Sequence, residues 1–80
     1  MKALVYVTLK QEVLDPQGKA IQKACRSLGY AAVDDVRQGK LFEITLDAES
    51  EAAARPMLEE LCDKLLANTV IEDYSIEKIE

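Results

Sequence analysis

Residues 41–46, Leu-Phe-Glu-Ile-Thr-Leu, alternate apolar and polar side chains and directly follow Gly39-Lys40. This alternation predicts a half-buried strand whose Phe42, Ile44 and Leu46 face the core. The preceding run, residues 32–38, predicts a short polar strand, and the glycine between the two runs predicts a hairpin turn. The pair decides the fold class, because it places two adjacent strands in the middle of the chain.

Two further strands and two helices are predicted on either side of this pair. Residues 2–9 and 70–79 alternate in the same way. A first helix is predicted from Pro16 to about Leu28, because Asp15 can cap its free amides and proline at the first position loses no hydrogen bond. A second helix follows residues 47–51. Pro56 requires it either to start near Arg55 or to bend there, and Asn68 predicts a left-handed stop.

The resulting order, β-α-β-β-α-β, predicts one α+β domain over residues 1–80. Right-handed crossovers make it a ferredoxin-like sandwich, a four-stranded antiparallel sheet with two helices on one face. The other face would then be bare. An ordinary solvated face and a self-association surface both remain open for it. Its predicted residues are Leu4, Tyr6, Thr8, Leu41, Glu43, Thr45, Asp73, Ser75 and Glu77.

Length and charge bound the possible partners. A domain of 80 residues has a marginal core, which favours a homo-oligomer of at least two copies. The formal net charge of −5 argues against nucleic acid and against anionic membranes. The first seven residues are typical of a strand rather than a signal peptide, so a cytoplasmic location with reduced thiols is expected.

No catalytic residue and no metal or cofactor site is predicted for this chain. Histidine is absent. Cys25 and Cys62 fall on helix faces that we expect to be buried, where a thiol is unreactive. The adjacent acid pairs, at 34–35 and 59–60, do not face a common site.

Three segments are more specific than a generic sandwich requires. Each has a structural explanation, respectively a helix cap, a hairpin turn and a core strand, and each is also a candidate partner interface. The candidate interface residues are Asp15, Pro16, Gln17 and Gly18 in the first segment, Arg37, Gly39 and Lys40 in the second, and Asn68, Thr69, Glu72, Asp73 and Tyr74 in the third.

Together these segments resemble the PurS family, the small subunit of phosphoribosylformylglycinamidine synthase. The resemblance rests on Leu-Asp-Pro-Gln-Gly at 14–18, Asp-Val-Arg-Gln-Gly-Lys at 35–40 and Leu-Leu-Ala-Asn-Thr-Val-Ile-Glu-Asp-Tyr at 65–74. The stretch Ala-Ala-Ala-Arg-Pro at 52–56 departs from the family pattern.

The resemblance implies a subunit of an ATP-dependent, glutamine-hydrolysing ligase of purine biosynthesis. In that complex a PurQ glutaminase releases ammonia, and a PurL synthetase binds ATP and Mg²⁺ and uses the ammonia. PurS, as a dimer, holds the two together and is suggested to guide ammonia between them. The main alternative is a metabolite-sensing regulatory module of the same fold. A small hydrolase such as a phosphatase is disfavoured, because the loop at residues 10–15 has no arginine to hold phosphate and the chain has no histidine.

Overall fold

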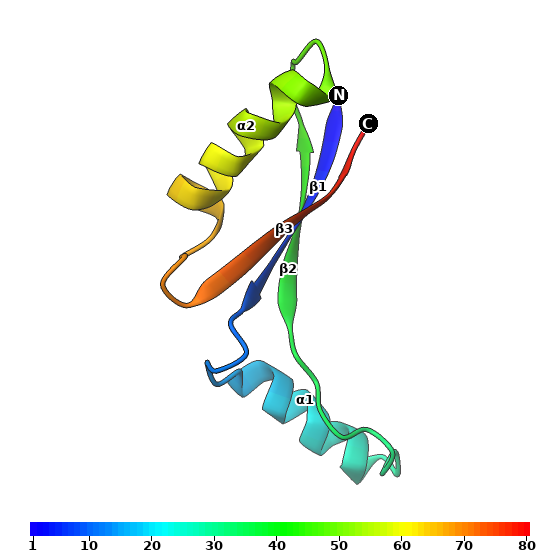
Figure 1. The fold of residues 1–80 in the computed structure, drawn as a ribbon. Helices are drawn as coiled ribbons and strands as arrows, with labels where there is room; N and C mark the ends of the chain where they lie inside the picture. Colours follow the sequence, from blue (N-terminus) through cyan, green and yellow to red (C-terminus); the bar gives the residue numbers. More distant parts are fainter.

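Three strands form one antiparallel sheet with the N-terminal strand in the middle (Figure 1). The computed structural model describes all residues, 1–80. Its elements are β1 (Lys2–Leu9), α1 (Pro16–Ser27), β2 (Gly39–Thr45), α2 (Glu51–Leu61), a π-helical turn η1 (Cys62–Leu66) and β3 (Glu72–Ile79). Val5 of β1 lies opposite Phe42 of β2 and Ile76 of β3. The α+β class and the strands predicted around 2–9, 41–46 and 70–79 are therefore confirmed.

The predicted fourth strand at residues 32–38 does not form, so the sheet has three strands rather than four. Gly39 and Lys40, predicted as a hairpin turn, are the first residues of β2. The backbone of 32–38 is instead bonded by side chains. The carbonyl of Asp34 accepts from Nε2 of Gln22 at 2.6 Å, and the amide of Gln38 donates to Asp15 at 2.7 Å. With few apolar side chains to bury, this segment gains little from joining a sheet.

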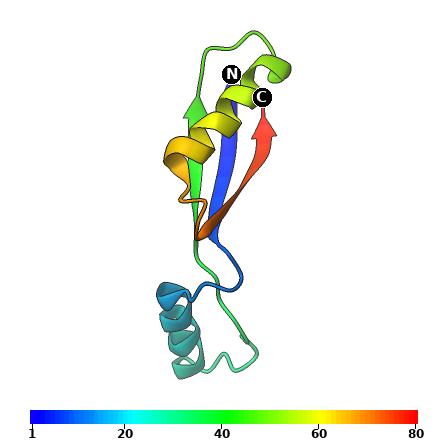
Figure 2. The same cartoon turned by 60° about the vertical axis from the view of Figure 1, so that its left-hand side comes forward.

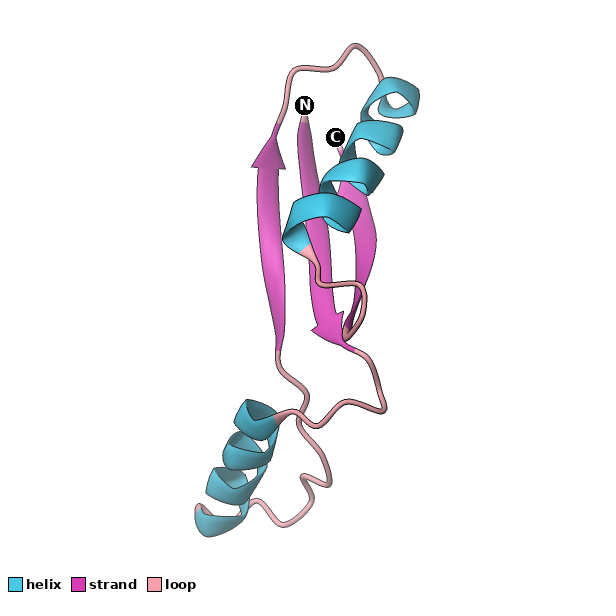
Figure 3. Cartoon of the chain, turned by 90° about the vertical axis from the view of Figure 1, so that its left-hand side faces the viewer, coloured by secondary structure: helices cyan, strands magenta, loops and turns pink.

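One face of the sheet is covered by α2 (Figure 3). Leu58 of α2 is fully buried in a cluster with Ala3, and Cys62 of η1 is fully buried in a second cluster with Val5 and Val7. The opposite face is bare, as predicted, and leaves Tyr6 and Leu41 substantially exposed. The core is small, because only nine residues of the chain are buried.

The second helix starts earlier than Pro56 suggested. Ser50 caps it by accepting from the amide of Ala53 at 3.2 Å, and Pro56 lies inside the helix. The helix continues into η1 and ends at Ala67, whose backbone is extended. The predicted left-handed stop at Asn68 is wrong, since no residue other than glycine has a positive φ. Asn68 instead accepts from the amide of Val70 through its side chain at 3.2 Å.

The first helix does not pack on the sheet, which corrects the prediction of two helices on one face. In Figures 1 and 2, α1 extends beyond the end of the sheet opposite the two chain termini. Gly18 is its only buried residue, and Ile21 and Leu28 are 43% and 75% exposed. Cys25, expected to be buried, is only half-buried. The radius of gyration is 15.9 Å, whereas a compact chain of this length has about 12 Å.

Candidate functional site

The three segments that the sequence singled out meet at one end of the sheet. Because β1 is antiparallel to both neighbours, its last residues lie beside the first residues of β2 and β3. Thr8 pairs with Gly39 on one side and with Asp73 on the other. Residues 15–18, 37–40 and 68–74 therefore surround the point where the chain leaves the sheet for α1 and returns from it. We call this region the junction.

Asp15 holds the outgoing and returning segments together. One carboxylate oxygen accepts from the amide of Gly18 at 3.0 Å and the other from the amide of Gln38 at 2.7 Å. The amide of Gln38, then that of Gly18, and the nearby charge of Arg37 lower the pKa of the Asp15 carboxyl. Asp15 is 5% exposed, so it acts within the chain as a buried anion.

Arg37 makes a second link between the same two segments. Its Nη2 donates to the carbonyls of Lys10 and Val13, both at 3.0 Å. Gly18 permits the backbone at Val36 to approach the first turn of α1 closely, because a Cβ at position 18 would lie 2.1 Å from the carbonyl oxygen of Val36.

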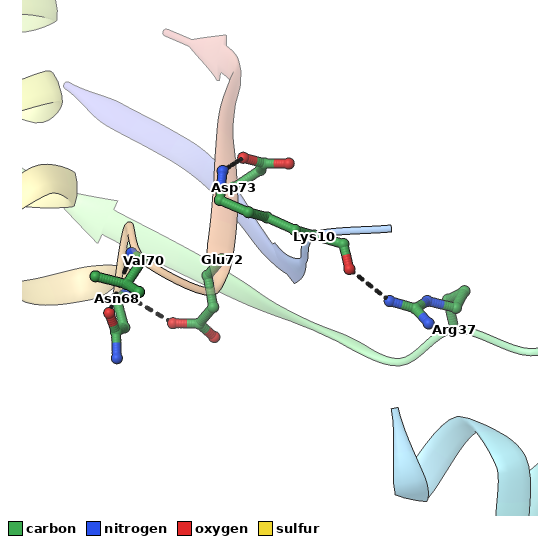
Figure 4. Close-up of polar contacts among 6 residues, drawn as sticks. All are labelled: Lys10, Arg37, Asn68, Val70, Glu72 and Asp73. Carbon is green, nitrogen blue, oxygen red and sulfur yellow. Dashed lines mark hydrogen bonds and ion pairs between the residues drawn. The ribbon is translucent and has the colours of Figure 1, made fainter. Parts of the chain in front are cut away.

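Ion pairs tie the start of β3 to its neighbours, as Figure 4 shows in part. Lys10 Nζ lies 2.7 Å from Oδ1 of Asp73, and this contact raises the pKa of Lys10. Lys40 Nζ lies 3.5 Å from Oε2 of Glu72, whose other oxygen accepts from the amide of Asn68 at 2.7 Å. These contacts fix the turn that precedes β3.

Tyr74 lies away from this polar network. It is half-buried against the core cluster of Val5, Val7, Cys62 and Ala67. Burial raises the pKa of its hydroxyl. Of the twelve candidate interface residues, Tyr74, Asp15 and Gly18 thus have clear roles inside the chain.

A cavity of about 430 Å³ opens at the junction. Val7 and Leu9 form its apolar wall, and Lys40 and Glu72 supply opposite charges. Its remaining lining residues are Asp15, Pro16, Gln17, Gln38 and Gly39. Six of the twelve candidate residues therefore line one cavity, whose position at the end of the sheet suits contact with a partner protein.

Two participants in the junction, Lys10 and Gln38, are not among the residues that the sequence predicts as candidates. The Lys10 carbonyl and the Gln38 amide are backbone atoms, so no side-chain pattern could have found these bonds. The ion pair of the Lys10 side chain with Asp73 depends on how β3 lies against β1, which residue types alone do not give.

Other chemistry is sparse in the structure. Both cysteines are free, and burial raises the pKa of the Cys62 thiol. No group of three or more histidine, cysteine, aspartate or glutamate side chains is arranged to hold a metal ion. No helix has both the length and the apolar character needed to span a membrane.

The fold and the junction define a class of protein, a small α+β chain that extends one helix away from its own core. A family model described as PurS, phosphoribosylformylglycinamidine (FGAM) synthase, matches residues 2–80. The chain therefore belongs to the PurS family.

Curated relatives agree over most of their length. The phosphoribosylformylglycinamidine synthase subunit PurS of Bacillus subtilis is 53% identical over 76 residues, which cover 95% of this chain and 89% of the relative. The subunit of the same name from Synechocystis sp. is 53% identical over 73 residues, which cover 91% of this chain and 73% of the relative.

Solved structures share the fold. PurS of B. subtilis superposes with a TM-score of 0.86 at 52% identity, covering 99% of this chain and 98% of that one. A chain of the PurLQS structure from Thermotoga maritima superposes with a TM-score of 0.85 at 26% identity, covering 99% of both chains.

Proposed function

We propose that this chain is the assembly subunit of a phosphoribosylformylglycinamidine synthase, in which it docks a PurQ-like glutaminase onto a PurL-like synthetase. The observation that carries the proposal is the near-complete match to a chain of the PurLQS structure, together with the identity to PurS subunits. A PurS from Methanocaldococcus jannaschii, 46% identical, is described as a subunit of an amidotransferase in the purine biosynthetic pathway.

We assign the catalytic groups, ATP and Mg²⁺ to the partners. The carboxylate of Asp15 already accepts two backbone amides, and the thiol of Cys62 is buried with a raised pKa. Neither group is placed to act as a nucleophile or a base. In this proposal, the chain works in the cytoplasm through its surfaces and promotes transfer of ammonia by keeping the two active sites together.

We further propose that a second copy of the chain covers α1. The apolar stripe of α1 is uncovered in the single chain, with Ile21 43% and Leu28 75% exposed. The helix carries three basic residues and no acidic one, whereas α2 with η1 has four acidic residues and two basic ones, so a second copy offers complementary charge. Leu65 in η1 is 74% exposed and offers apolar surface beside those acids.

The exposed members of the junction are the proposed contacts with the two enzyme partners. They surround the cavity and the turn before β3, and they are not used in the core. They are Pro16, Gln17, Arg37, Gly39, Lys40, Asn68, Thr69 and Asp73, with the less exposed Glu72 paired to Lys40.

Reconstitution with the two partners tests the proposal. Omitting the chain should reduce glutamine-dependent turnover far more than turnover with ammonium salt, because bulk ammonium bypasses docking. Full glutamine-dependent turnover without the chain would reject the assembly role, and the regulatory-module hypothesis would replace it.

A matched pair of charge reversals refines this test. Lys40→Glu should lower the glutamine-dependent rate by about tenfold if this junction residue contacts a partner. Lys78→Glu, at the other end of the sheet, is the control, because its side chain is 59% exposed against 61% for Lys40 and each lysine pairs with a glutamate. Equal effects of the two variants would argue against a junction interface.

A further inference from the structure

The chain passes from β1 to α1 and returns from α1 to β2, and we call these two connecting segments the crossings. A small set of residues joins them. We call this set the clasp, and it consists of Asp15, Gly18, Val36, Arg37 and Gln38. α1 has no other residue buried apart from Gly18. The direction of the helix relative to the sheet therefore depends on these few contacts and on the bond from Gln22 to the Asp34 carbonyl.

A single carboxylate does two jobs in the clasp. Through Gly18 it caps the first turn of α1, where the amides have no partner within the helix. Through Gln38 it binds the last residue before β2. The start of the helix and the start of the strand are thus bonded to the same side chain, whereas an ordinary cap would satisfy only the helix.

Gly18 and Arg37 close the clasp from two sides. The Val36 carbonyl approaches Gly18 so closely that a methyl group would lie 2.1 Å away. Arg37 spans the two crossings, donating to the carbonyls of Lys10 and Val13. Three independent contacts in so short a region restrict rotation of the crossings against each other.

We propose that the clasp presets the direction in which α1 leaves the sheet, and that this preset direction is what makes the chain competent to assemble. The inference rests on the proposed assembly function. A helix held in its binding direction loses less conformational freedom on association than one that swings on two loops. Asp15 and Gly18 are therefore positioning residues, which act through α1 without touching a partner.

Two substitutions break the clasp in different ways. Asp15→Asn keeps the shape, but its amide group donates, so either the Gly18 or the Gln38 amide would face a second donor. Gly18→Ala places a methyl group against the Val36 carbonyl and also 2.7 Å from Oδ2 of Asp15, while the intrinsic helix preference of alanine over glycine favours α1. Asp35→Asn is the matched control, on the same returning segment and exposed.

The first measurement is amide hydrogen exchange of the full chain. In Asp15→Asn, exchange at the Gly18 or the Gln38 amide, whichever faces the NH₂ group of the asparagine, should accelerate about tenfold or more, the range expected for losing a bond to a charged acceptor. Amides in the centre of β1 should remain protected, and Asp35→Asn should match the wild type. Unchanged exchange at both Gly18 and Gln38 would overturn the clasp, and so would equal acceleration in the core, which would indicate general destabilisation.

The second measurement is titration of each variant into the reconstituted complex. With Asp15→Asn and Gly18→Ala, the concentration of chain that gives half the maximal glutamine-dependent rate should rise about tenfold, while the maximal rate is retained. A wild-type titration for both variants would overturn the positioning role. If the complex needs no such chain at all, the proposed function fails, and exchange at the Gly18 and Gln38 amides then decides whether the clasp holds.

Discussion

At the scale of single residues, Asp15 is the clearest case of a charged side chain whose hydrogen-bond partners are backbone amides. Two amides and Arg37 favour its ionised form, which lowers its pKa in the folded chain. Lys10 shows the complementary case, since Asp73 favours its charged form. Charged side chains at the junction are thus stabilised in their ionised forms by partners within the chain, which are backbone amides for Asp15 and a carboxylate for Lys10.

Asp15 should make stability depend on pH in the acid range. The stabilisation from its ionisation is fully present above the pKa of an unfolded aspartate, about 3.9, and is lost as the pH falls through the lower folded pKa. The difference in melting temperature between wild type and Asp15→Asn should therefore be largest near neutral pH and shrink below about pH 4. A constant difference from pH 7 to pH 2 would show that ionisation of Asp15 contributes nothing.

At the scale of elements, strand positions were predictable because alternation along 41–46 reports directly on burial. The start of α1 was predictable too, since Asp15 and Pro16 act locally. The fourth strand was not correctly predicted, because residues 32–38 are bonded by Asp15 and Gln22, which the pattern of that segment cannot reveal. Apolar spacing identified the stripe of α1 but carried no information on what covers it.

The candidate site was likewise predictable only in part. Its three segments were recognisable from the sequence, but their convergence depends on the register of β1 against both neighbours, which residue types alone do not give. The inward role of Asp15 and the bonds to Lys10 and Gln38 became visible only with the backbone in place.

Pro56 provides a test at the element scale. It sits inside α2, where it cannot donate to the carbonyl of Ala52 four residues earlier. Pro56→Ala should raise the free energy of unfolding by about 1–3 kcal/mol, less than the full helix penalty because proline also restricts the unfolded chain. Glu59→Ala, exposed on the same helix, should change it by less than about 0.5 kcal/mol in chemical denaturation. A destabilised Pro56→Ala variant would mean that the proline favours the native helix.

At the scale of the whole molecule, the chain is an extended body of 50 × 25 × 14 Å. The sheet with α2 and η1 holds six of the nine buried residues, and α1 holds one. Such a division is typical of a chain whose folding is completed by association, since a small core alone supplies little stability. We therefore expect a mass above that of one chain, 8.9 kDa, in light scattering at micromolar concentration.

The labelling rates of the two cysteine thiols test this association without any substitution. Cys62 is fully buried in the core and Cys25 lies half-buried on the apolar face of α1. If a second copy covers α1, a thiol reagent should label Cys25 more slowly as protein concentration rises, because only the dissociated chain exposes that face.

Cys62 is the internal control. Its labelling should be slow at every concentration and should accelerate only in denaturant, because burial disfavours its thiolate. Peptide mapping after labelling separates the two rates. A Cys25 rate that does not change over a hundredfold range of concentration, in a sample that light scattering finds to pass from one chain to an oligomer, would place the contact between copies elsewhere. The bare sheet face around Tyr6 and Leu41 would then be the surface to test next, because these two large apolar side chains of the sheet are also exposed in the single chain.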